Sequence, residues 1–532
     1  MFTIKFTGNL GNKLFELWAL HGIAAAENTK AFYPASDIYD YFEGDFPVLP
    51  MDGPTTNEPA FTYTPINEVP GYDAAQDHIL KGFFQSEKYW LPVEKELRKM
   101  YNFKKDFVKH TKAKTASLFK KEVICISIRR GDFVNNPVYY QLPALYYIGA
   151  LIEHFPNFES QYNILILSDD MEYCRVHFGC LPNVFFADGL TPMEQLCLGA
   201  HSQYHIISNS TFSWWCAYLS KSKKVIRPKY NFQDGYRGTH PEVDFWPETK
   251  GWEIFDHQPY RIPLKDATFM IPVFFDHTDR KQNLSLTVCM LQRDFDTNII
   301  VMENNGYQFQ NFSQWCRYEH TTHKHFHRTR MLNQMAVMAD TPFIYNWDAD
   351  VIVPTLQIWQ SIEQLRTKKA DFCYPYDGRF VRVLRRPYFK IVSQSLDIGI
   401  LGNQEFFTNG QIQGKPMATT SVGGAVAMNR AKFIQSGMEN EHMVSYAPED
   451  AERWDRWHML GYKVKRIIGK LFHLDHWCGA DSCSLNPFFT KNHKELDKIR
   501  GMQPDELDRY VYSWEWRQRA AQAERDRKKE VI

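Results

Sequence analysis

The chain has 532 residues, which is too long for one ordinary hydrophobic core and predicts at least two domains. Lys+Arg and Asp+Glu both total 62, so the cationic excess of nucleic-acid-binding proteins is absent and we expect no nucleic-acid partner. The sequence contains no run of about 18 apolar residues and begins without a signal-peptide pattern. We therefore expect no membrane span, a cytoplasmic location and reduced cysteines.

Along residues 1–260, short apolar strands alternate with segments of helical length. A first strand is predicted at Phe2–Phe6 and a first helix at Gly11–Ala26. Further strands are predicted at Val123–Ile128, Asn163–Leu167, Val184–Phe186, Tyr204–Ile207 and Lys224–Ile226, and further helices at Pro143–His154, Pro192–Ala200 and Phe212–Leu219. This alternation predicts an α/β fold with parallel sheets, in which ligands bind beyond the carboxyl ends of the strands.

The alternation starts again near residue 262. Strands are predicted at Thr268–Phe275, Thr297–Met302 and Pro342–Trp347, and a helix at Arg328–Ala339. We predict three parts: a first α/β module over residues 1–262, a second over residues 263–500, and a charged helical tail over residues 501–532. The charge of the last 20 residues is typical of a solvated terminal helix.

A glycine-rich turn joins the first strand to the first helix. Gly8 and Gly11 allow a ligand close to the backbone, and the helix N-terminus supplies free N–H donors. A strand-to-helix turn also needs glycine for conformational reasons alone.

Two adjacent arginines, Arg129 and Arg130, follow the predicted strand Val123–Ile128. Guanidinium groups donate in a planar fork that matches phosphate oxygens, so this pair could hold a diphosphate. The alternative is an internal ion pair between Arg130 and Asp132. Asp169 ends the next strand in the same way.

The segment Ser208–Trp215 places small polar residues directly before a predicted helix. Asn209, Ser210 and Ser213 could bind phosphate at this helix N-terminus, or could simply cap the helix.

The order of these motifs resembles the alpha-1,2-fucosyltransferases of glycosyltransferase family 11. The matching stretches are GNLGNKLF at Gly8–Phe15, KGFFQSEKY at Lys81–Tyr89, SIRRGDFV at Ser127–Val134, LSDDMEY at Leu167–Tyr173, SNSTFSWW at Ser208–Trp215 and KVIRPK at Lys224–Lys229. The resemblance implies a GT-B-type fold of two Rossmann-like subdomains and inverting transfer from GDP-fucose without a metal.

By position, the resemblance implies that Arg129 and Arg130 hold the donor diphosphate. It further implies a donor pocket completed by Gly8, Gly11, Asp169, Asn209, Ser210 and Ser213, with Asn12 and Arg129 close to the reacting centre. The family pattern has a histidine two residues before the first arginine, where this chain has Ser127. A hydroxyl can donate a hydrogen bond there but cannot replace an imidazole.

In the second half, Asp348 and Asp350 follow the predicted strand Pro342–Trp347. Two carboxylates at a strand end suit a divalent ion such as Mn²⁺ or Mg²⁺, which prefers oxygen ligands and shares them with phosphates. A metal-held diphosphate is a good leaving group because the metal neutralises its charge.

Three further motifs follow this acidic pair. Gly423 and Gly424 form a close-approach loop, and Glu449 with Asp450 opens an amphipathic helix. We interpret Asp450 as the general base, although acidic residues in a first helical turn are also stabilising by themselves. His473 and His476 follow a strand-like run and could be metal ligands or surface histidines.

This second set of motifs resembles the GT-A glycosyltransferases, in particular the beta-4-galactosyltransferase and polypeptide N-acetylgalactosaminyltransferase-like group with its family 2 relatives. The resemblance also draws on FHRTRMLN at Phe326–Asn333. It implies a UDP-sugar donor, Mn²⁺ at Asp348, Asp350 and the histidines, and inverting transfer with Asp450 as the base and Glu449 beside it. It also implies nucleotide contacts from Arg280, Glu303 and Arg328.

The sequence therefore predicts a bifunctional glycosyltransferase that acts on a glycan or glycoconjugate acceptor. Its first module would transfer fucose, and its second a hexose or N-acetylhexosamine. Two alternatives stay open: a single active GT-A module with the first half as an acceptor-binding domain, and a carbohydrate-binding or scaffold protein without turnover.

Overall fold

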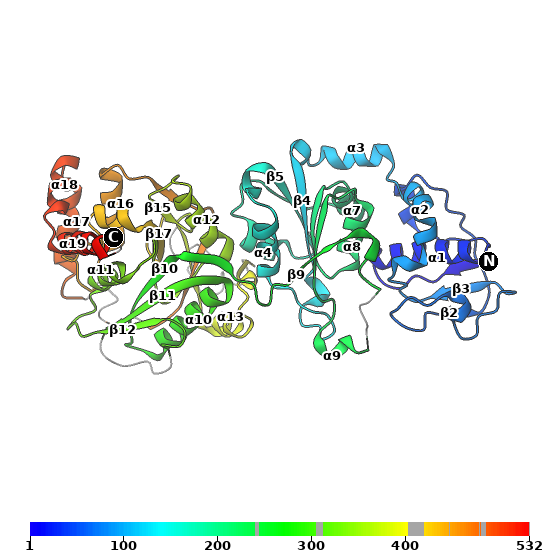
Figure 1. Cartoon of the computed structure of the whole chain (residues 1–532), viewed down its shortest axis with the longest axis horizontal. Coiled ribbons are helices and arrows are strands. Elements are labelled where there is room, and N and C mark those ends of the chain that lie inside the picture. The colour runs from blue at the N-terminus through cyan, green and yellow to red at the C-terminus, as the bar shows by residue number, and fades with distance from the viewer. Residues whose placement is uncertain are drawn as a thin grey trace. The chain divides into compact units, whose positions relative to one another are not determined.

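The computed structural model describes residues 1–239, 244–304, 312–402, 420–445, 447–477, 479 and 486–530. Its internal contacts divide the chain into two compact units (Figure 1). The first unit consists of Met1–Cys174 and Leu181–Pro259, and the second of Arg175–Cys180 and Tyr260–Ile532.

The first unit is built around a parallel sheet with the strand order β6-β5-β4-β7-β8-β9. Its central strand β4 reads EVICISI and is almost continuously apolar, as expected for a strand covered on both faces. These strands are β4 (Glu122–Ile128), β5 (Tyr162–Ser168), β6 (Val184–Phe186), β7 (Tyr204–Ile207), β8 (Lys224–Pro228) and β9 (Glu253–Phe255). The predicted strands and their parallel arrangement are confirmed.

A smaller parallel sheet, β1-β3-β2, precedes this one in the chain. Its strands are β1 (Phe2–Ile4), β2 (Thr55–Asn57) and β3 (His78–Lys81). The helices of the first unit include α1 (Leu10–Ala26), α2 (Glu94–Met100), α3 (Lys105–Ala113), α4 (Ala144–His154), α5 (Phe158–Gln161), α7 (Pro192–Ala200), α8 (Thr211–Leu219) and α9 (Asp234–Arg237), while α6 (Met171–Phe178) extends across the division of the chain.

Buried aromatic side chains pack α1 against α8. The ring centres of Trp18 and Trp215 are 5.0 Å apart, and both side chains are fully buried. Trp90 stacks on Trp215 from a third segment. This packing fixes the turn between β1 and α1 next to the start of α8.

The second unit contains a larger mixed sheet with the strand order β12-β11-β10-β13-β17-β15-β18. The strands from β12 to β13 are mutually parallel, and β17 is antiparallel to both of its neighbours. These strands are β10 (Ile262–Phe274), β11 (Phe295–Asn304), β12 (Arg317–Thr321), β13 (Phe343–Trp347), β15 (Phe372–Tyr374), β17 (Ala425–Asn429) and β18 (Val464–Arg466). Both units are therefore mixed α/β structures with parallel strands, as predicted.

A second small sheet, β14-β19-β16, lies where the chain leaves β13. Its strands are β14 (Val351–Ile352), β16 (Arg379–Val383) and β19 (Lys470–Leu474). The helices of this unit include α10 (Thr278–Asp294), α11 (Arg328–Met338), α12 (Thr355–Arg366), α13 (Lys390–Ser395), α15 (Arg430–Gln435), α16 (Glu449–Met459), α17 (Phe489–Arg500), α18 (Pro504–Tyr512) and α19 (Glu515–Glu530).

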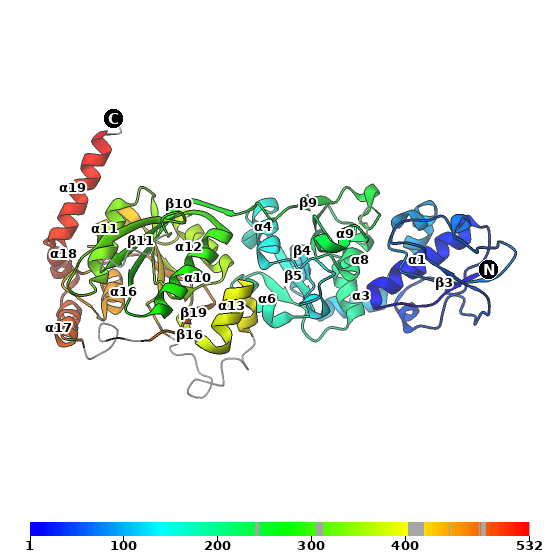
Figure 2. The ribbon, with the colours of Figure 1, turned by 90° about the horizontal axis from the view of Figure 1, so that it is seen from below.

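The charged tail is helical and most of its residues are exposed or partly exposed, but one side of it packs against the protein. Figure 2 shows α19 as a long helix that continues from α18. Trp514 and Trp516 before and within α19 are almost fully buried, and the indole of Trp516 donates to the carbonyl of Gly437. Arg527 donates to the carbonyls of Val337 and Ala339 at the end of α11. None of the helices in the described residues combines the length and the apolar composition that a membrane span requires.

Candidate functional site

In the first unit, the predicted donor residues meet at one edge of the large sheet. Strands β5, β4 and β7 are parallel neighbours, so their carboxyl ends lie side by side. Asp169 follows β5, the two arginines follow β4, and Asn209 follows β7. This is the edge at which parallel α/β sheets bind ligands.

Carboxylates hold both arginines at this edge. Arg129 pairs with Asp169 at 2.7 Å and with Asp132 at 2.5 Å. The backbone N–H of Arg130 donates to Asp169 at 2.8 Å, and its guanidinium stacks on the ring of Tyr173 at 3.9 Å. The internal pair with Asp132 is therefore made by Arg129. A cluster of two cations with several carboxylates results, fixed across the ends of two strands.

The polar segment before α8 is bonded within the protein. The amide of Asn209 donates to the carbonyls of Tyr140 and Asn231 at 2.8 and 2.7 Å. Ser210 is the N-cap of α8, and the hydroxyl of Ser213 lies 2.6 Å from that of Ser208. These contacts give the segment a capping and bracing role, whatever it binds.

The glycine turn lies against this segment. A side chain at Gly11 would come within 2.6 Å of the backbone of Phe212, so α1 and α8 can approach this closely only with glycine there. Gly8 has a φ of +88°, and a Cβ at Gly8 would lie 2.4 Å from the Asn12 amide. The structure thus brings Gly11 beside Thr211 and Phe212 at the start of α8, and Gly8 beside Asn12.

Ser127, at the position of the family's histidine, lies within β4 and is 3% exposed. Its hydroxyl is 3.7 Å from the thiol of Cys125. A buried hydroxyl facing a thiol presents no imidazole-like group to the sheet edge.

In the second unit, Asp350 and two histidines form a compact group. Strand β14 pairs with β19 so that Val351 lies opposite His473. The Nε2 atoms of His476 and His473 lie 3.0 and 3.5 Å from the Asp350 carboxylate. One ligand atom from each of the three residues falls within 4.8 Å of the others. A divalent metal requires such convergence.

The chemistry of this group suits Mn²⁺. Burial lowers the pKa of His473, which favours the neutral imidazole that binds metal, and the buried Nδ1 atom of His473 has no hydrogen-bond partner within the described part of the chain. Burial alone would raise the pKa of Asp350, but the histidines and Arg280 hold it well below its usual value. Because carboxylate and neutral imidazole are accepted ligands of Mn²⁺, these residues fit the ion.

Asp348 lies outside this group. Its carboxylate accepts from Arg328 at 2.7 Å, and its backbone N–H donates to the carbonyl of Gly424 at 2.9 Å. Burial is the largest cause of its raised pKa, and Asp350 and Asp450 raise it further. The structure thus separates the acidic pair: Asp350 faces the histidines and Asp348 faces an arginine.

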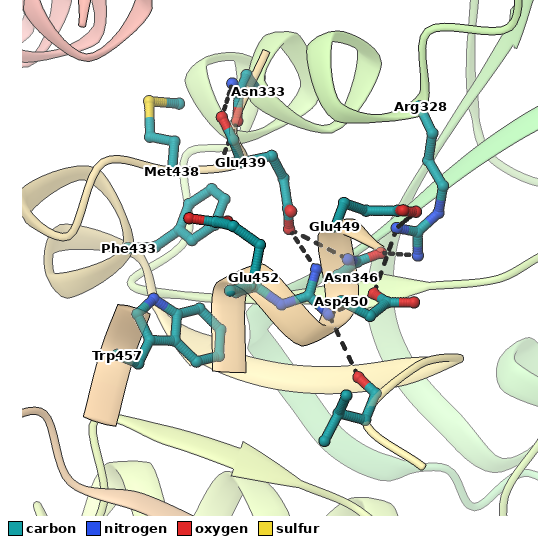
Figure 3. A network of polar contacts seen from close by, with 12 residues as sticks. Arg328, Asn333, Asn346, Phe433, Met438, Glu439, Glu449, Asp450, Glu452 and Trp457 are labelled. Atoms are coloured by element: carbon teal, nitrogen blue, oxygen red, sulfur yellow. Dashed lines mark hydrogen bonds and ion pairs between the residues drawn. The ribbon is translucent and has the colours of Figure 1, made fainter. Parts of the chain in front are cut away.

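Arg328 also reaches the start of α16. It donates to Glu449 at 3.0 Å and to Asp450 at 3.5 Å, so one guanidinium links Asp348 to the candidate base (Figure 3). Burial would raise the pKa of Asp450, but Arg328 and Arg453 lower it. Burial and the neighbouring Asp450 raise the pKa of Glu449 to about 8.

The glycine loop fits between these groups. A Cβ at Gly423 would lie 2.7 Å from Oδ2 of Asp450, and Gly424 has a φ of +85°. The hydroxyl of Tyr376 donates to the carbonyl of Gly423 at 2.5 Å. Glycine therefore leaves space on one side of the candidate base.

The two remaining predicted residues are held by neighbours. Glu303 is fully buried and accepts from the hydroxyl of Tyr318 at 2.5 Å. Arg280 pairs with Asp276 at 2.7 Å and lies 3.6 Å from Asp350. Arg280 therefore adds positive charge beside the metal group.

Sequence reasoning missed two residues of this network. Arg453 bonds Asp450 at 2.6 Å and follows it by one helical turn, a spacing that could have predicted the contact. Glu439 bonds Arg453 at 2.7 Å from a segment that follows α15, and no sequence pattern indicates this contact.

Comparisons with known proteins agree with the geometry of the first unit, an α/β domain with its charged cluster at the carboxyl edge of a parallel sheet. The family model described as Glycosyl transferase family 11 matches residues 64–252. This match confirms, for the N-terminal region, the resemblance to family 11 seen in the sequence.

Curated relatives carry related activities in their names. The alpha-1,2-colitosyltransferase of Escherichia coli is 32% identical over 152 residues, which is 26% of this chain and half of the relative's length. A galactoside 2-alpha-L-fucosyltransferase of Caenorhabditis elegans is 25% identical over 47% of this chain and 78% of its own length. Among solved structures, GalNAc-T7 with UDP, GalNAc and Mn²⁺ covers 44% of this chain and 48% of its own at 11% identity, with a TM-score of 0.32.

Proposed function

We propose that the chain is a bifunctional glycosyltransferase. Its first unit transfers fucose from GDP-fucose to a glycan hydroxyl, in an alpha-1,2 linkage, with inversion and without a metal. The family 11 match carries this proposal, and the arginines at the carboxyl edge of the sheet support it. In this role Arg129 and Arg130 bind the diphosphate, and Asp169 holds both in place.

The names of the relatives suggest which sugars to test. One transfers colitose and another acts on galactosides, so colitose is a second candidate for the donated sugar and a galactoside is a candidate acceptor. Transfer assays with both donors on a galactoside would distinguish them.

The second unit, in our proposal, is a GT-A module that transfers a hexose or N-acetylhexosamine from a UDP-sugar. The convergence of Asp350, His473 and His476 beyond the central strand of a mixed sheet supports it. These residues would hold Mn²⁺, which supplies positive charge to the leaving diphosphate. Arg280 and Arg328 add fixed positive charge around the same place.

Asp450 is the proposed base of this second reaction. An acceptor hydroxyl gives its proton to Asp450 while its oxygen bonds to the anomeric carbon. The bond from that carbon to the diphosphate breaks, and UDP leaves with the electron pair. Attack opposite the leaving group inverts the configuration. Glu449, with its raised pKa, stays protonated beside Asp450 at neutral pH.

A second candidate function keeps activity in the second unit alone. Ser127 replaces the family's histidine and is buried, and the arginines are already balanced by carboxylates. In this case the first unit would bind the acceptor glycan.

Calorimetric titration of GDP and UDP into the intact protein, first with Mn²⁺ and then with EDTA, tests the proposal. Two donor sites require that GDP binds with or without metal and that UDP binds only with Mn²⁺. Binding of UDP without binding of GDP would favour the single-activity alternative. Failure of both nucleotides to bind would refute the proposed function.

A further inference from the structure

A chain of buried charges lies behind the candidate base. Glu439 is fully buried, and the Arg453 side chain is 1% exposed. The Oε1 atom of Glu439 accepts from Nη1 of Arg453 at 2.7 Å (Figure 3). The Nη2 atom of the same guanidinium donates to Oδ1 of Asp450 at 2.6 Å. One arginine therefore connects a buried glutamate to the base.

This arrangement makes the two oxygens of Asp450 different. Oδ1 accepts from Arg453 and, at 3.5 Å, from Arg328. Oδ2 faces the position at Gly423 where no side chain stands. An acceptor hydroxyl could approach Oδ2 from the glycine loop, while Oδ1 holds the carboxylate in orientation.

Glu439 itself is firmly anchored. Its backbone N–H donates to Asn333 at 2.8 Å, and the amide of Asn333 donates back to its carbonyl at 2.9 Å. The amide of Asn346, two residues before Asp348, donates to the Glu439 carboxylate at 3.3 Å. Burial of an ion pair adds little stability over apolar residues of the same size, so stability alone does not explain this pair.

We propose that Glu439 is a positioning residue for the base of the second unit, an inference that rests on the proposed function of Asp450. Its carboxylate holds one edge of the Arg453 guanidinium and neutralises part of its charge. Arg453 then offers a single nitrogen to Asp450, so Oδ2 stays available and basic. Without Glu439, the positive charge of the Arg453 guanidinium would attract the Asp450 carboxylate more strongly.

Other charged or titratable groups face Asp450 from the surrounding elements, and Glu439→Gln leaves the chemical identity of each of them unchanged. They are Arg328, Asp348, Tyr374, Tyr376, Glu449 and Arg453.

Glu439→Gln tests the proposal, and α16, the helix that carries Arg453, offers a matched control. Glu452 and Arg456 form a second fully buried ion pair on α16, and Arg456 bonds backbone carbonyls at Ser436 and Met438, without any contact to Asp450. Glu452→Gln therefore removes a comparable buried charge at a comparable risk to folding. Glu439→Asp restores the charge as a rescue variant.

The first measurement is the NMR titration of the Asp450 carboxyl carbon in protein labelled at aspartate, assigned with Asp450→Asn. We expect Glu439→Gln to lower the midpoint by about one pH unit, because an anion that opposes Arg453 is lost. Glu452→Gln and Glu439→Asp should keep the wild-type midpoint. An unchanged midpoint in Glu439→Gln, or an equal shift in Glu452→Gln, would overturn the proposal.

The second measurement is the release of UDP from UDP-galactose and from UDP-N-acetylgalactosamine with Mn²⁺, with water as the acceptor. Glu439→Gln should lower kcat about tenfold with an unchanged KM for the donor, because a weaker base accepts the proton less readily. If the wild-type protein releases no UDP from either donor, the proposed function fails, and the titration still decides whether Glu439 sets the state of Asp450.

Discussion

The two units place different charged groups at the carboxyl ends of their parallel strands. In the first, Arg129 and Arg130 bring the positive charge themselves, and carboxylates only hold them in place. In the second, two imidazoles converge on the Asp350 carboxylate, a set of groups that would bind the positive charge of a metal ion. A diphosphate can be bound by either arrangement, because both put compact positive charge where parallel strands end.

The difference teaches what each site should respond to. A site built from arginines keeps its charge at all working pH values, and a chelator does not change its affinity for the ligand. A site built from histidines and a carboxylate depends on metal and on proton concentration. Variants and conditions that affect one unit only are therefore the sharpest tests.

The largest effect is expected from Asp350→Asn. This substitution removes the only carboxylate of the metal group described in the structure, so Mn²⁺-dependent UDP binding should weaken by about 100-fold or more. GDP binding should not change. Calorimetry of both nucleotides measures this, with the exposed Asp340→Asn as a control. Equal weakening of GDP binding would break the comparison.

Arg129→Ala should affect the other nucleotide, GDP. Loss of a charge-assisted bond to phosphate should weaken GDP binding by about 10- to 100-fold and leave UDP binding intact. Arg237→Ala, which removes an arginine that pairs with Asp234 in the same unit, serves as the control. GDP affinity equal to wild type in Arg129→Ala would show that the arginine pair has a purely structural role.

Acidification should separate the two sites. The bond to Asp350 raises the pKa of His476 above its usual 6.5 even though burial opposes it. Protons therefore compete with the metal below this pKa, and Mn²⁺-dependent UDP binding should fall by about tenfold per pH unit as the pH is lowered from 7 to 5. GDP binding should stay level until carboxylates protonate. A parallel loss of both would contradict the assignment of the histidines.

The smallest effect concerns the two glycine loops. In Gly11→Ala the added methyl group would collide with the backbone of α8, which cannot move easily. The substitution should therefore lower the free energy of unfolding by about 1 kcal/mol or more. In Gly423→Ala the added methyl group would contact only the end of the Asp450 side chain. Stability should therefore change less, while the turnover of the second unit falls. Thermal unfolding followed in both variants checks this order, and Gly235→Ala, with open space around it, is the control.

Much of the fold could be predicted because buried parallel strands are plainly apolar. Strands β4 and β13 were identified from their apolar runs, and the charged residues that follow them mark the sheet edge. The strand order was not predictable, since the pairing of β13 with β17 joins segments about 80 residues apart. The split of Asp348 from Asp350 depends on another distant pairing, that of β14 with β19, which brings His473 to Asp350, and so lay beyond sequence reasoning.

The C-terminal tail is a case in which composition predicted the helix but not its packing. A charged composition predicted solvation, yet Trp516 and Ala520 give α19 a buried side. Two aromatic residues and one small residue decide the packing, whereas charge counts describe only the outer face. Glu439 is a similar case, because burial of a lone acid becomes understandable only when Arg453 is seen beside it.

The packing of α19 has a practical consequence for handling the protein. A protease that cuts between α17 and α19 would free a segment whose Trp516 bonds the carbonyl of Gly437 and whose Arg527 bonds carbonyls at the end of α11. The exposed surface would carry apolar patches and unsatisfied carbonyls, so nicked material should precipitate rather than persist as a trimmed enzyme. Survival of the intact chain during limited digestion is thus a convenient gauge of whether a preparation is sound.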